Sequence, residues 1–221
     1  MFWTLEQVTG PVGDLEPVTL PEARLQVREF DDVTANDAHI TSLITSAREW
    51  AEDYTGRALV DQTWRLTVGD VYREAVPLVD TQRLTQGTEE WRRTSGLLLR
   101  RSPIIAITAF NSIDNTSTET AVDATHYELR EGSSKWPRLA ALTGATWPTL
   151  TSGIDLQVTF RAGFADQTGS PQTGVEVIPE RFRQAILLHV EAFYKRDDDM
   201  EKLLAAAKNL LKGQVCHVGF A

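Results

Sequence analysis

The chain has 221 residues, and its 42% hydrophobic content is sufficient for the core of one domain, or of one domain with an insertion. Its formal net charge of −9 argues against a groove that binds DNA phosphates tightly, because such grooves depend on clustered lysine and arginine. A single cysteine excludes an intramolecular disulfide framework. With no signal-peptide pattern and no apolar run of about 20 residues, we expect a soluble protein made in a reducing cytoplasm.

Two helices are predicted in the N-terminal quarter. A capping box at residues 19–22 opens a short helix. A longer helix is predicted at 36–54, where apolar residues recur at steps of three and four, as one buried helical face requires. Thr34 or Asn36 can cap its start, and Gly56 stands where a left-handed C-terminal cap belongs. Its apolar positions are Ile40, Leu43, Ile44, Ala47, Ala51 and Tyr54.

Between residues 61 and 174 the apolar period changes from that of a helix to that of a strand. The clearest case is 154–160, which alternates apolar and polar residues throughout, so one face is buried and the other is exposed to solvent. Further strands are expected at 64–68, 97–101, 104–110 and 127–129, with a turn at 111–118 and long exposed loops at 80–95 and 165–174.

A helix predicted at 179–196 is apolar on two sides. Pro179 suits its first turn, where a missing amide proton does no harm. One side carries Phe182, Ile186, His189 and Phe193, and the other carries Leu187, Val190 and Tyr194. Such a helix is central in its domain or shared with a neighbouring subunit. A last helix is predicted at 200–212, and the apolar tail that follows it suits burial by a partner.

These patterns predict an α+β fold. It consists of a small helical bundle of about four helices, with an antiparallel β module inserted between the second and third helices. The expected divisions are 1–60 with 175–213 for the helical bundle, 61–174 for the inserted β-rich module, and 214–221 for an extended C-terminal tail.

Sequence motifs for catalysis or metal binding are missing. There is no phosphate-binding loop, dinucleotide glycine pattern, nucleophile elbow or zinc-spaced Cys/His set. Cys216 and His217 combine a thiol and a base, but neighbours in an extended tail point to opposite sides. His189 is interpreted as a packed helix residue, and residues 197–199 as solvated acids at the start of the last helix. We therefore expect no catalytic residue, no metal site and no cofactor.

The order and spacing of several short segments point to a known family. The most recognisable segment is 40–57, and the others are 18–23, 62–64, 101–104, 127–129, 147–148, 158–164 and 178–194. Together they resemble the head–tail connector (adaptor) proteins of tailed bacteriophages, in the longer subfamily that carries a β insertion. The resemblance covers about residues 18 to 196. The loop at 80–95 and the chain after Met200 depart from it.

The resemblance implies a structural role without catalysis. About a dozen copies would form a ring, a dodecamer, beneath the portal protein of a virus or gene-transfer particle. The ring would extend the DNA channel, without sequence-specific DNA binding, and would dock the next neck (stopper) or tail protein. The protein would be assembled in the host cytoplasm, would have no membrane partner, and would reside in the virion neck, at the head–tail interface.

Candidate partner-binding residues lie in three places, for contacts with the portal or a neighbouring subunit. They are Leu187, Val190 and Tyr194 on the helix at 179–196, Val215, His217, Val218 and Phe220 in the tail, and Trp91 in the loop at 80–95. Two other classes stay open. A baseplate or receptor-binding β module would use loops around Trp91 and Trp147 as aromatic contacts, and a hydrolase would use dispersed carboxylates.

Overall fold

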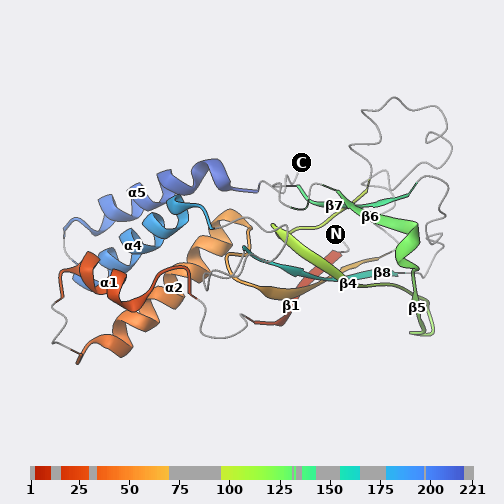
Figure 1. Ribbon diagram of the computed structural model, residues 1–221, viewed down its shortest axis with the longest axis horizontal. Helices are drawn as coiled ribbons and strands as arrows, with labels where there is room; N and C mark the ends of the chain where they lie inside the picture. The colour runs from red at the N-terminus through yellow and green to blue at the C-terminus, as the bar shows by residue number, and fades with distance from the viewer. Residues whose placement is uncertain are drawn as a thin grey trace. The chain divides into compact units, whose positions relative to one another are not determined.

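The computed structural model describes residues 3–10, 16–29, 34–69, 96–130, 132, 136–142, 155–164, 178–196 and 198–216 (Figure 1). The chain forms two compact units. One is a sheet unit of Met1–Gly10 and Gln62–Ala162, and the other is a helical unit of Pro11–Asp61 and Gly163–Ala221. The two loops predicted at 80–95 and 165–174 lie outside the described residues.

The helical unit contains α1 (Leu20–Val27), α2 (Asp37–Thr55), α4 (Glu180–Lys195) and α5 (Met200–Leu211), and the short 3-10 helix η3 (Lys212–Gln214) follows α5. Helix α4 packs against each of the other three α-helices. It lies between α5 on one side and α1 with α2 on the other (Figure 1). The largest fully buried side chains of this core are Ile40, Leu59, Phe164, Phe182, Ile186 and Leu211.

The predicted helix ends are confirmed to within one residue where a local signal marks them. The backbone amide of Thr19 donates to the Glu22 carboxylate at 2.8 Å, which is one half of the predicted capping box. Gly56 ends α2 at φ 69°, in the left-handed conformation expected of a C-cap. Asn36 precedes α2 but does not cap it with its side chain, because its amide donates to Glu29 instead, at 2.6 Å.

The sheet unit is built from two antiparallel sheets. The first has the strand order β1 (Trp3–Thr9), β2 (Gln62–Val68), β8 (Asp155–Ala162), β4 (Ile104–Ile113) and β5 (Glu119–Ala121). The second has the order β3 (Leu97–Leu98), β7 (Arg138–Ala141) and β6 (Tyr127–Arg130), and the 3-10 helix η2 (Ala124–His126) precedes β6.

The core of the sheet unit follows the predicted period of two. On β8 every second side chain is buried, and Val158 stands opposite the buried Leu66 of β2. Phe110 of the first sheet contacts Tyr127 of the second, with their ring centroids 5.4 Å apart in an edge-to-face arrangement. Side chains from both sheets therefore form this core.

The N-terminal division predicted from the sequence is wrong. Residues 1–60 were assigned as a whole to the helical bundle, but strand β1 pairs antiparallel with β2, so residues 1–10 belong to the sheet unit. The physical reason is that β1 is stabilised by pairing with β2, about 60 residues away, and a contact over that distance leaves no local signal in the sequence. Only Trp3 and Leu5 of β1 are even partly buried, so its apolar pattern is weak.

The turn predicted at 111–118 begins later than expected. Strand β4 continues to Ile113, because its residues 111–113 pair with both β8 and β5. The turn itself is organised by Asp114, whose carboxylate accepts hydrogen bonds from the backbone amides of Thr116 and Thr118 at 2.8 and 2.9 Å. Strands β5 and β7 were not predicted from the sequence.

The α+β class itself is confirmed. Two α-helices precede the strands β2 to β8, two follow them, and every strand pair in the described part of the chain is antiparallel. None of the described helices is both long enough and apolar enough to cross a membrane.

Candidate functional site

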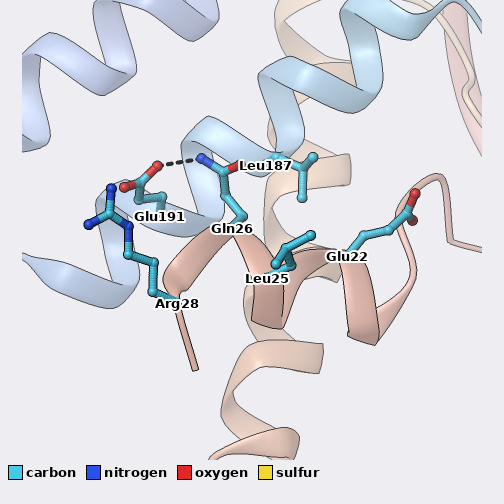
Figure 2. A pocket seen from close by; sticks show the side chains of 6 residues that line it. All are labelled: Glu22, Leu25, Gln26, Arg28, Leu187 and Glu191. Carbon is cyan, nitrogen blue, oxygen red and sulfur yellow. Dashed lines mark hydrogen bonds between the residues drawn. The ribbon is translucent and has the colours of Figure 1, made fainter. Parts of the chain in front are cut away.

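A groove of about 430 Å³ lies between α1 and α4 (Figure 2). We call it the α1–α4 groove, and its lining residues are Glu22, Leu25, Gln26, Arg28, Leu187 and Glu191. Leu25 is 80% exposed, which is unusual for a leucine on a helix that packs in a bundle. Leu187 is half-buried beside it. The groove thus combines two apolar side chains with charged residues at both ends.

Ion pairs hold the two acidic residues of the groove in place. At one end Glu22 pairs with Arg183 of α4. At the other end Gln26 donates to Glu191 at 2.5 Å, as Figure 2 shows, and Lys195 forms an ion pair with the same carboxylate. The Glu22–Arg183 and Gln26–Glu191 contacts bridge α1 and α4, so the walls of the groove are fixed in position relative to each other.

Both acidic residues are ionised at neutral pH. Burial alone would raise the pKa of Glu191, but hydrogen bonds from Lys195 and Gln26 and the charges of Lys195 and Arg28 outweigh it, so that this pKa lies below its ordinary value. The pKa of Glu22 also lies below its ordinary value. Burial alone would raise it, but hydrogen bonds from Thr19 and the charge of Arg183 outweigh that effect. The rim of the groove therefore carries two carboxylates that are each paired with a cation, Glu22 with Arg183 and Glu191 with Lys195.

The residues predicted on the second side of α4 do not share one environment. Leu187 lines the α1–α4 groove and is accessible to a partner. Tyr194 is half-buried, and its hydroxyl accepts a hydrogen bond from Asn36 at 3.2 Å. Val190 is fully buried in the core of its own chain, so its prediction as a partner contact is wrong. Its spacing of four residues from Ile186 places it on the inward face of the helix.

The predicted tail begins as ordered structure. Gln214 is the last residue of η3 rather than the start of an extended segment, which corrects the expected boundary. Its side chain accepts from Arg57 at 2.9 Å, and the amide of Cys216 donates to the carbonyl of Thr55 at 2.8 Å. Val215, between them, is half-buried. The C-terminal end of α2 therefore holds this part of the chain.

Four of the predicted partner-binding residues lie outside the described residues, namely Trp91 in the loop at 80–95 and His217, Val218 and Phe220 in the tail. Their roles stay predictions. Because His217 is among them, the orientation of its side chain relative to Cys216 also stays a prediction. Cys216 itself is half-buried.

His189 is a packed residue, as predicted. It is only 6% exposed, and its ring stacks between Trp50 and Phe193 with centroid distances of 4.6 Å to each. Its Nδ1 atom has no hydrogen-bond partner among the residues that the structure describes. Burial therefore disfavours the charged imidazolium and lowers the pKa of His189 to about 4.

The acidic corner before α5 agrees with its prediction at two of its three residues, and Asp197 lies outside the described residues. Asp198 and Asp199 are exposed, and Asp199 immediately precedes α5 and pairs with Lys202 at 2.6 Å. Throughout the described ranges, no cluster of three or more histidine, cysteine, aspartate or glutamate side chains is placed to hold a metal ion.

The buried His189 predicts a loss of stability in acid. The folded pKa of about 4 lies below the unfolded value near 6.5, so the unfolded chain binds the proton first and stability falls as the pH drops from about 6.5 towards 4. We expect a contribution on the order of 2 kcal/mol across this window. Urea unfolding at pH 7 and pH 5 measures it. A His189→Phe variant keeps the stacked ring and should lose less stability between the two pH values, whereas an equal loss would contradict the prediction.

Leu25 and the groove around it were not predicted from the sequence. Helix α1 has eight residues, which is too short for an apolar period to distinguish an inward from an outward leucine. A usable signal was present nonetheless. The core positions Ala23 and Val27 of α1 are four residues apart, and Leu25, halfway between them, falls on the opposite side of a helix.

Comparison with known proteins identifies solved structures of the same α+β fold. A chain of the virion of a native gene transfer agent particle is 25% identical, covers 93% of both chains, and superposes with a TM-score of 0.63. A chain from the neck of the empty particle, computed with C6 symmetry, is 24% identical over 94% of both chains, with a TM-score of 0.62. A chain from the neck of the native particle, computed with C12 symmetry, is 22% identical over 99% of this chain and 98% of that one, with a TM-score of 0.62.

This protein thus shares its fold, over nearly its whole length, with chains of the virion and neck of a gene transfer agent particle. No protein-family profile matches it, and no curated protein sequence does.

Proposed function

We propose that this protein is a structural component of the neck of a tailed phage or a gene-transfer particle, where it serves as the head–tail adaptor. Several copies form a ring beneath the portal, extend the DNA channel, and dock the next neck or tail protein. The observation that carries this proposal is the match over 93% of both chains to a virion chain of a gene transfer agent particle. A match of that extent includes the helical unit and the sheet unit together.

The assembly symmetry of the related chains supports a ring. Those chains come from necks computed with C6 and C12 symmetry. Identical subunits related by rotation need two different surfaces that fit each other, since each copy contacts one neighbour on each side. The helical unit carries an accessible groove with an apolar centre, which is the kind of surface such contacts use.

The charge of the chain is compatible with a channel wall. A lining that bound phosphates strongly would slow the passage of DNA, whereas a neutral or acidic one would not. The net charge of −9 falls on the acidic side.

Negative-stain imaging of this protein mixed with portal rings encoded by the same genome tests the proposal. We expect additional ring density stacked coaxially on one end of the portal. The portal rings alone serve as the control. Intact portal rings without added density would overturn the adaptor function, and specific binding of a host receptor or glycan by the isolated protein would then favour a receptor-binding module.

A further inference from the structure

We draw no further inference here: the strongest candidate, the α1–α4 groove with the exposed Leu25 and the half-buried Leu187, carries nothing because both of its carboxylates are already paired and nothing in the described part of the chain shows what covers its apolar side chains.

Discussion

Replacing Gly163 by alanine is expected to lower the free energy of unfolding of the helical unit by about 4 kcal/mol, the sum of a steric and a conformational cost. Gly163 has φ 149°, a conformation that side chains rarely adopt. A Cβ atom there would lie 2.3 Å from the carbonyl oxygen of Val60 and 2.5 Å from its carbonyl carbon. Backbone atoms cannot rotate out of the way as a flexible side chain can.

The clash occurs where two distant segments of the helical unit meet. The amide of Phe164 donates to the carbonyl of Leu59 at 3.3 Å, and both side chains are fully buried. Any shift that accommodates a methyl group on Gly163 must separate these segments. It would also disturb the contact of Phe164 with Phe182, whose ring centroids are 5.9 Å apart.

Urea unfolding followed by circular dichroism measures this effect. Gly213→Ala is the matched control, because a Cβ atom added there meets no heavy atom within 4 Å, and its stability should stay within about 1 kcal/mol of the wild type. Loss of the folded transition altogether would agree with the prediction. A Gly163→Ala variant as stable as the control would show that the two segments separate without cost.

Replacing Arg48 by methionine is expected to cost about 3 to 5 kcal/mol, because it removes the arginine that pairs with the buried carboxylate of Glu52. Arg48 is only 4% exposed and donates to Glu52 at 2.8 Å and to Glu16 at 2.9 Å. Glu52 is 7% exposed and also accepts from the backbone amide of Leu59 at 2.7 Å. Arg48 thus joins α2 to the segment before it, and Glu52 joins α2 to the segment after it.

A second variant distinguishes the loss of charge balance from a loss of packing. Glu52→Gln, added to Arg48→Met, removes the buried negative charge and retains an oxygen that accepts from Leu59, so it should recover part of the lost stability. Arg181→Met, at an exposed position on α4, is the control and should change stability by about 0.5 kcal/mol or less. If the double variant were less stable than Arg48→Met, charge imbalance would not be the cause.

The helices and the clearest strands could be predicted from the sequence because their signals are local. The spacing of Ile40, Ile44, Ala47 and Ala51 defines the buried face of α2, and each of these residues is buried in the structure. Gly56 marks the end of the same helix. The alternation in β8 places its buried residues on one face in the same way.

Edges and contacts between distant segments could not be predicted in this way. Strand β1 depends on β2, which is about 60 residues away, and its weak alternation does not reveal that partner. The sequence pattern likewise grouped Val190 with Leu187 on one partner-binding face of α4. The two residues are three positions apart, and the rotation between them is enough to separate a buried residue from an accessible one. Only the packing of α1 against α4 shows which of the two is accessible.

The sequence by itself therefore determined the α+β class, the order of the main elements and the packed role of His189, since periodicity and capping act over a few neighbouring residues. The tertiary structure alone decided which surfaces are accessible. Leu25 is exposed because α1 turns its Ala23 and Val27 side inward, and the groove exists because α4 lies beside it. The groove is not encoded in a local pattern, because it depends on where a helix more than 150 residues away comes to lie.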